Sequence, residues 1–186
     1  MNAMTAILEM PNDLPFAPKA DAPVMYKPVA EQEDTHDMRG QLLNREAIVR
    51  FIEAGNATFT IVSKKSGTRF TYNLSRPKAN GNAPRPIWVG VLNGQDNNSD
   101  FAFAGTVWLA AHGYSFRQSA KAVVKPTAPS LQLFLWPVTA LNQGRDESIT
   151  KQAEFWHEGK CGRCGRKLTV PASINSGFGP ECITKI

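Results

Sequence analysis

The three cysteines of this chain all lie in its last 26 residues. Cys161 and Cys164 are separated by two residues, and 17 residues stand between Cys164 and Cys182. Gly162 and Gly165 permit the tight backbone turn that directs both sulfurs of such a pair to one point. Thiolate sulfur is a preferred ligand of Zn²⁺ in structural sites. The spacing therefore predicts a zinc site built from these three cysteines.

A closed tetrahedral zinc site needs a fourth ligand. His157, with three residues between it and Cys161, is the nearest candidate. Glu158 and Glu181 are alternatives, although structural zinc prefers nitrogen and sulfur to carboxylate oxygen. Four protein ligands would leave no position for water, so the predicted role of the single zinc ion is structural.

The residues around Cys182 predict how it is positioned. The dipeptide Gly179-Pro180 is typical of a helix start, which places Cys182 in the first turn of a short terminal helix. A knuckle, a small hairpin and a ligand at a helix start are typical of a treble-clef-like finger. The last thirty residues have few large apolar side chains, so a metal would supply the stability that burial cannot.

Three other readings of the cysteines stay open. A thioredoxin-like redox pair would need a strand before it and a helix after it within a parallel sheet, and glycines and arginines follow here instead. A disulfide with one free thiol conflicts with a reducing compartment. Three inert thiols would leave their clustering among glycines unexplained.

The segment CGRCGRKLTVPASINSGFGPEC, from Cys161 to Cys182, carries a family resemblance. It resembles a zinc-finger-like domain of unknown function from bacteriophage, prophage and plasmid proteins. The upstream stretch AGNATFTIVSKKSGTRFTY is similar to the N-terminal body of some proteins of that group. The resemblance implies an origin in a mobile element and zinc ligation by the three cysteines. It implies no particular activity.

Hydrophobic periodicity predicts an α+β body over residues 39–145. The stretch LLNREAIVRFIEAG has an apolar stripe at helical spacing, with Asn44 as its cap and Gly55 as its stop. Residues 57–63, 69–75, 87–93 and 100–109 alternate as strands and predict an antiparallel meander. In the last strand the alternation predicts one face for Phe101, Phe103, Val107 and Leu109.

A second helix is expected after the meander. Ser130 is its predicted cap, and Pro137 predicts an end or a bend near Trp136 because proline removes one backbone bond. The fold class is thus α+β, an antiparallel sheet with flanking helices and a small finger over residues 146–186. Residues 1–38 are rich in proline and acidic side chains, which predicts a disordered or peripheral leader.

Charge is divided unevenly along the chain. Residues 1–41 hold 3 basic and 7 acidic side chains, whereas residues 42–186 have a net charge of +9. A basic body favours a polyanionic partner, most often nucleic acid. Cations interleaved with aromatic rings suit non-specific binding of single strands. The predicted contacts are Lys64, Lys65, Arg69, Tyr72, Arg76, Lys78, Arg85, Trp88, Arg163, Arg166 and Lys167.

The sequence shows no motif of an enzyme. It contains no phosphate-binding glycine loop and no nucleophile elbow, which favours a non-enzymatic protein. The alternative function is that of a phage-type inhibitor or adaptor that binds a host protein, including one of a defence system. With no apolar run of membrane-spanning length and no signal peptide, the expected location is the cytoplasm of a bacterial host.

Overall fold

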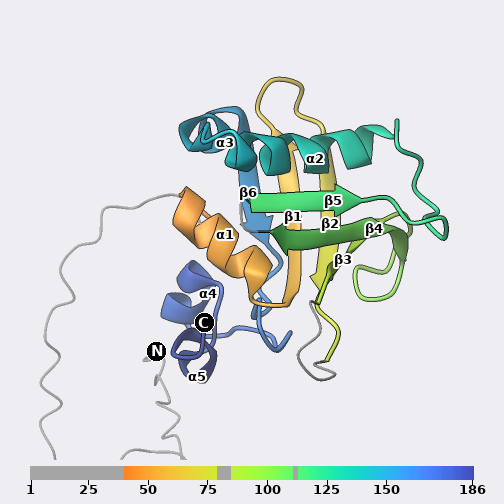
Figure 1. Ribbon diagram of the computed structural model, residues 1–186. Coiled ribbons are helices and arrows are strands. Elements are labelled where there is room, and N and C mark those ends of the chain that lie inside the picture. The colour runs from red at the N-terminus through yellow and green to blue at the C-terminus, as the bar shows by residue number, and fades with distance from the viewer. Residues whose placement is uncertain (1–39, 79–84, 111–112) are drawn as a thin grey trace, which may run out of the picture. The chain divides into compact units, whose positions relative to one another are not determined.

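The computed structural model describes residues 40–78, 85–110 and 113–186. The predicted leader at residues 1–38 lies outside these ranges. All described residues belong to one compact unit, which is an antiparallel six-stranded sheet with helices (Figure 1). The α+β fold class predicted from the sequence is therefore confirmed.

The strands lie in the order β5-β4-β3-β2-β1-β6, and each neighbouring pair is antiparallel. The strands are β1 (Asn56–Ser63), β2 (Arg69–Ser75), β3 (Ile87–Leu92), β4 (Phe101–Ala110), β5 (Gly113–Arg117) and β6 (Ala153–His157). The helices are α1 (Arg45–Glu53), α2 (Pro129–Asn142), α3 (Asp146–Gln152), α4 (Pro171–Ser176) and α5 (Pro180–Ile183). The predicted meander corresponds to β1–β4, whereas β5 and β6 were not predicted.

Helix α1 begins as its sequence predicts. The Asn44 side chain accepts a hydrogen bond of 2.9 Å from the backbone N–H of Ala47, and Glu46 lies in the first turn. Ile48 and Phe51 are fully buried, so the apolar stripe of the helix does face the core. Leu43, an apolar residue at the start of the stretch from which the helix was predicted, is 57% exposed because it precedes the cap and lies outside the helix.

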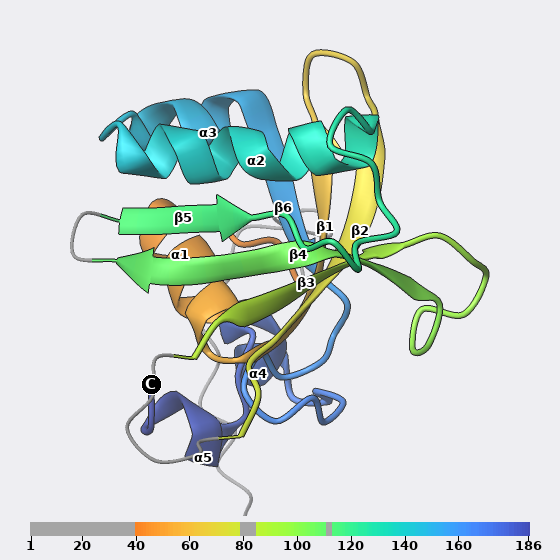
Figure 2. The same cartoon turned by 45° about the vertical axis from the view of Figure 1, so that its right-hand side comes forward.

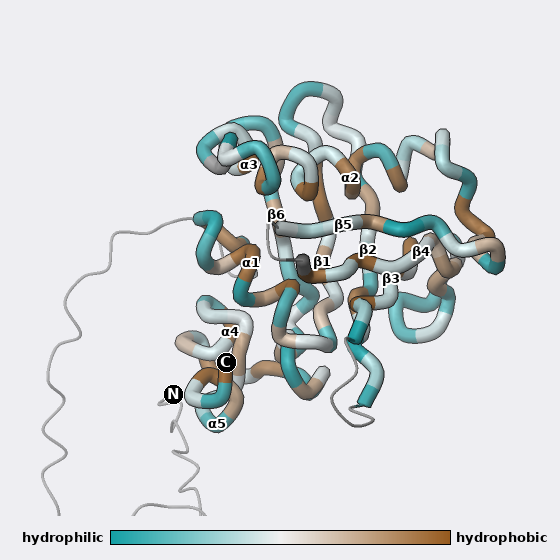
Figure 3. Tube along the Cα trace, viewed as in Figure 1, coloured by the Kyte–Doolittle hydropathy of each residue, from teal (hydrophilic) through white to brown (hydrophobic). Residues whose placement is uncertain are grey.

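One face of the sheet forms the hydrophobic core. Phe59 of β1 pairs with Tyr72 of β2, and Tyr72 pairs with Val91 of β3, so their side chains share a face. All three are buried. Helix α2 lies next to β5 in both views, and α3 packs against α2 and β6 (Figure 2). Figure 3 shows apolar residues within β1 and a hydrophilic turn between β1 and β2.

A β-bulge in β4 overturns one prediction of register. Val89 pairs with Gly105 but Gly90 pairs with Phe103, so Ala104 has no partner on β3. One unpaired residue exchanges the two faces of the strand beyond it. Val107 consequently faces the core, while Phe101 and Phe103 lie on the opposite face. The prediction that Phe101, Phe103, Val107 and Leu109 share one face was therefore wrong.

Helix α2 runs unbroken through Pro137 to Asn142, so the predicted end near Trp136 was wrong. The backbone bond that proline removes is lost, but Pro137 is itself buried together with Phe134 and Ala140. Packing of this face against the sheet offsets the lost bond. The predicted cap at Ser130 was also wrong, because the N-cap is Ala128 and a proline occupies the first turn.

The C-terminal segment shares a strand with the sheet. β6 lies after the predicted boundary between body and finger at residues 145–146, yet it pairs with β1 along Phe59–Ser63. The backbone N–H of Leu42 donates to the carbonyl of Phe155 at 2.8 Å, which ties the start of the body to β6. In the ranges that the structure describes, no helix has the length and apolar character that crossing a membrane would require.

Candidate metal centre

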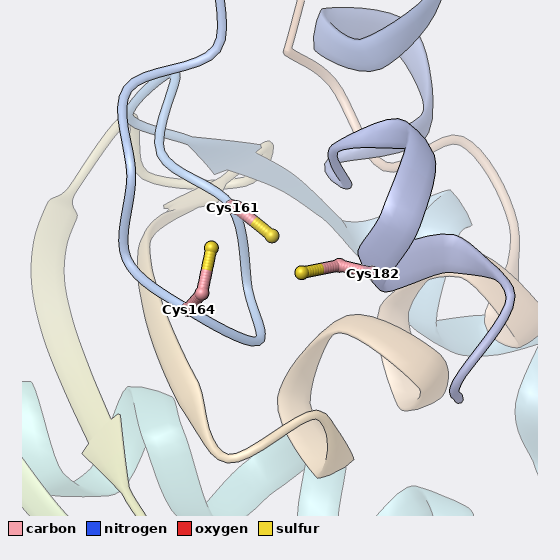
Figure 4. Close-up of side chains that lie close together, drawn as sticks. All are labelled: Cys161, Cys164 and Cys182. Carbon is pink, nitrogen blue, oxygen red and sulfur yellow. The ribbon is translucent and has the colours of Figure 1, made fainter.

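The sulfur atoms of Cys161, Cys164 and Cys182 lie within 4.8 Å of one another. Figure 4 shows the three side chains pointing toward a common centre, two from the knuckle and one from α5. Among the described residues, this is the one group of three or more histidine, cysteine or acidic side chains with such spacing. Two thiols 21 positions apart in the sequence are thus brought together by the fold.

Backbone hydrogen bonds hold the knuckle in shape. The N–H of Cys161 donates to the carbonyl of Arg166 at 2.8 Å, and the N–H of Gly165 donates back to the carbonyl of Cys161 at 2.8 Å. Gly165 has a φ of +72°, which favours glycine, and a Cβ there would lie 2.6 Å from Nδ2 of Asn56. The turn therefore depends on this glycine both for its backbone conformation and for space.

Helix α5 presents Cys182 as predicted. Gly179 is the N-cap, Pro180 occupies the first position, and the N–H of Cys182 donates to the carbonyl of Gly179 at 2.9 Å. The short helix is anchored to α1, because the guanidinium of Arg50 donates to the carbonyl of Ile183 at 3.0 Å. Cys182 is thereby held at a fixed distance from the knuckle.

The surroundings of Cys161 favour its thiolate. Burial raises the pKa of this thiol, but hydrogen bonds from the backbone N–H groups of Gly179, Cys164 and Arg163 outweigh burial and bring the pKa to about 7. By contrast, burial and the neighbouring thiols raise the pKa of Cys182. Backbone N–H groups directed at sulfur are the outer-shell interactions that stabilise metal-bound thiolates.

His157 does not join the three sulfurs, so its predicted role as fourth ligand is not what the structure shows. Its Nε2 lies 2.6 Å from the carbonyl oxygen of Ile174. A carbonyl oxygen can only accept, so Nε2 carries the proton and donates. Its Nδ1 accepts from the N–H of Gly159 at 3.1 Å. Both ring nitrogens are therefore occupied by the main chain and the imidazole is neutral. No nitrogen is left with a free lone pair for a metal.

His157 instead links the sheet to the finger. The residue belongs to β6, where it pairs with Phe59, and its ring bonds to α4 through Ile174. The ring also lies 5.4 Å, centroid to centroid, from that of Phe51. Burial lowers the pKa of this histidine, an effect that the hydrogen bond to Ile174 opposes. The neutral ring is thus part of the joint between the two regions.

The C-terminal finger packs against Phe51 of α1. Its ring lies 5.7 Å from that of Phe178, and both side chains are buried. A Cβ on either Gly162 or Gly177 would lie 2.8 Å from the Phe51 ring. The glycines of the C-terminal motif therefore permit close packing of the knuckle on α1, in addition to shaping turns.

The three thiols suit a metal ion that prefers sulfur. A tetrahedral Zn²⁺ with zinc–sulfur bonds of about 2.3 Å separates its sulfur ligands by roughly 3.8 Å. Sulfur atoms within 4.8 Å of one another need little movement to reach that geometry. The cluster could hold a metal ion with three protein ligands.

A surface depression adjoins the sulfurs. Its lining combines the thiols with the exposed side chains of Arg166, Lys167 and Glu181. Of the alternative ligands, Glu181 therefore lies beside the centre, whereas Glu158 lines a depression formed with Thr60 and Thr71 of the sheet.

The predicted nucleic-acid contacts are scattered over the molecule. Tyr72 is fully buried and its hydroxyl donates to the carbonyl of Ser130 at 2.7 Å, so its predicted role in base stacking was wrong. Trp88 is 51% exposed on β3. The cations of the predicted set that are exposed are Lys64, Lys65, Arg69, Lys78, Arg85, Arg163, Arg166 and Lys167.

Besides Arg85, whose exposed guanidinium donates to the carbonyl of Pro77 at 3.5 Å, two of the predicted cations are engaged by the fold. The ammonium of Lys64 donates to the carbonyl of Thr150 at 3.0 Å, and its N–H bonds to the carbonyl of Gln152, so Lys64 caps α3. Arg76 is half-buried, and its Nε and Nη2 are buried without a hydrogen-bond partner in the described part of the chain. Neither is a simple exposed phosphate contact.

Comparison with known proteins bears on the C-terminal region. Residues 151–186 match a family of unknown function (DUF6011), so the match covers 36 of the 186 residues. It includes β6, His157 and all three cysteines. No curated protein and no solved structure matched the chain.

Proposed function

We propose that this protein is a non-enzymatic, zinc-containing protein in which one zinc ion fastens the C-terminal finger. The observation that carries the proposal is the convergence of three cysteine sulfurs within 4.8 Å. A thiol-only donor set selects zinc over hard cations such as Mg²⁺ or Ca²⁺. When bound, the metal supplies a cross-link between the knuckle and α5, and the chain's own groups shape the site around it.

The metal content of the purified protein tests this part of the proposal. We expect about one zinc per chain, and substitution with Co²⁺ should produce the intense charge-transfer bands of several thiolate ligands. The visible bands also report whether the fourth ligand is oxygen, nitrogen or sulfur. A metal content near zero in protein with a folded C-terminus would overturn the proposal of a zinc site.

The second part of the proposal is binding of nucleic acid. It is supported by the charge of +9 over residues 42–186 and by the exposed cations of the β1–β2 turn and the finger. Phosphate contacts release counterions, so binding should weaken steeply as salt rises. The competing function is binding of a host protein. A protein with that function would show no such affinity for bulk nucleic acid.

A salt series on a labelled oligonucleotide tests this part. Lys65→Ala with Arg69→Ala removes two exposed cations, whereas Lys64 is left in place because it caps α3. The slope of log K against log salt should shrink by up to about 1.4 for single strands. Unchanged affinity and slope, together with capture of a host protein that resists nuclease treatment, would favour the inhibitor or adaptor function.

We also propose an origin in a mobile element of a bacterium, which places the protein in the host cytoplasm. This rests on the C-x-x-C and G-x-G-P-x-C pattern of the finger. Phage or plasmid genes beside the coding sequence would support it. A position among chromosomal housekeeping genes across many hosts would count against it.

A further inference from the structure

The side of the sheet opposite the core carries several large aromatic rings. Register assigns Trp88, Phe101, Phe103, Trp108 and Trp156 to this side, which we call the outer face. Trp88 is exposed, and the other four rings are half-buried. Clusters of large apolar rings at a partly exposed surface are typical of binding sites.

One row across the outer face combines a ring, a hydroxyl and a cation. Trp88 of β3 pairs with Thr106 of β4, which in turn pairs with Arg117 of β5. Strands in a sheet lie about 4.8 Å apart, so the backbones of Trp88 and Arg117, two strands apart, are separated by roughly 10 Å. Trp108, two residues after Thr106, lies in the next row, and the Arg117 guanidinium lies 5.1 Å from the centre of its ring.

The bulge in β4 adds to this surface. Because Ala104 has no partner on β3, the side chains of Phe101 and Phe103 lie on the outer face beside Gly90. A Cβ on Gly90 would lie 3.0 Å from the Cβ of Phe101, so the glycine gives this aromatic residue its room. The aromatic surface thus extends from Trp108 toward the β3–β4 connection.

Cations outnumber acidic side chains in the segments that form this part of the sheet. Residues 54–95 and 101–145, which hold β1–β5 and α2, contain ten lysines and arginines but no aspartate or glutamate. Acidic side chains near the outer face come from other segments, as Glu154 of β6 does. The connection between β3 and β4 adds Asp96 and Asp100, whereas the cations in and next to β3, β4 and β5 include Arg85, Arg117, Lys121 and Lys125.

We infer that the β3–β5 half of the outer face binds single-stranded nucleic acid, with a base stacked on Trp88 and phosphates at Arg85 and Arg117. This inference rests on the nucleic-acid binding proposed above and names its surface. An exposed ring can stack only on a base whose own face is free. The bases of a duplex are stacked on one another, so single strands fit this surface and duplexes do not.

The test compares labelled oligothymidylate and oligouridylate of twenty nucleotides with a duplex of equal length, using the full chain loaded with zinc. Trp88→Ala should weaken single-strand binding by about 5- to 150-fold, which corresponds to the loss of one stacked base. Trp88→Phe, which keeps a ring, should recover most of the affinity. The two single-stranded probes show whether DNA or RNA is preferred.

Matched variants separate stacking from charge and from folding. Arg85→Gln with Arg117→Gln should reduce both the affinity and its salt slope, whereas Lys151→Gln should leave both unchanged. Lys151 is an exposed cation on α3, away from the outer face, and bonds to Glu147. Melting curves should change little for Trp88→Ala, because this side chain is half exposed in the folded state.

The outcomes distinguish this inference from the function on which it rests. If the wild-type protein binds oligonucleotides but Trp88→Ala and the double arginine variant bind equally well, the surface is wrong and nucleic-acid binding stands. Preference for the duplex over both single strands also overturns the inference. If the wild-type protein binds no probe at low salt, both proposals fail.

Discussion

Each of the three thiols is individually necessary for a tight metal site in our proposal. Cys161→Ser removes the ligand with the lowered pKa and replaces sulfur with a hydroxyl that binds zinc poorly at neutral pH. We expect zinc content to fall from about one per chain to near zero after dialysis, as measured by elemental analysis. Ser173→Ala is the control, because Ser173 lines the same depression without a thiol. Equal zinc in both variants would contradict the assignment.

Tyr72 is the residue whose predicted role changes most with the structure. Its ring packs at 5.3 Å from that of Phe134, and its hydroxyl bonds to the carbonyl of Ser130. Tyr72→Phe keeps the ring and removes one hydrogen bond, so the free energy of unfolding should drop by about 1 kcal/mol. Denaturant melts measure that loss. Oligonucleotide affinity should stay unchanged, and a clear fall in affinity would restore the binding role predicted from sequence.

At the scale of elements, the joint between β6 and α4 should be sensitive to acid. The folded-state pKa of His157 is lowered, so below about pH 6.5 the unfolded chain takes up the proton more readily than the folded protein. Stability should therefore be complete above that pH and decline as pH falls toward the folded-state pKa. Protonation of Nδ1 would also place a donor against the N–H of Gly159.

The variant His157→Gln isolates this contribution. It removes the titrating group, so the decline in melting temperature between pH 7 and pH 5.5 should be smaller than in the wild-type protein. Both proteins are compared in metal-free form, so that release of metal in acid does not contribute. The Cys161 thiolate takes up a proton in the same way in both. Parallel declines in the two proteins would show that His157 does not cause the pH dependence.

Across the whole molecule, the sheet and the finger should differ in their dependence on metal. The core strands bury their own apolar face, whereas residues 159–186 bury few large side chains. Chelation should therefore increase hydrogen exchange at the knuckle and α5 and leave β1–β4 protected. Exchange measured by mass spectrometry, with and without a chelator, tests this. Loss of protection throughout the sheet would show instead that the metal supports the entire fold.

Local signals in the sequence were sufficient for much of the structure. The Asn44 cap, the positions of strands β1–β4 and the start of α5 at Gly179-Pro180 were predicted correctly, because each depends on the chemistry of a few adjacent residues. The same holds for the knuckle, whose cysteine spacing requires a turn.

Other features depended on contacts between distant segments. The pairing of β6 with β1 and the engagement of both His157 nitrogens by the main chain arise only when the sheet is assembled. Pro137 was misread because its cost is local while the burial that offsets it is tertiary. The bulge at Ala104 is set by pairing with β3, and one unpaired residue determines which face Phe101 and Phe103 occupy. Residue types and spacing thus determined the site of three thiols. Tertiary packing decided that His157 is not its fourth ligand and that aromatic rings line the outer face.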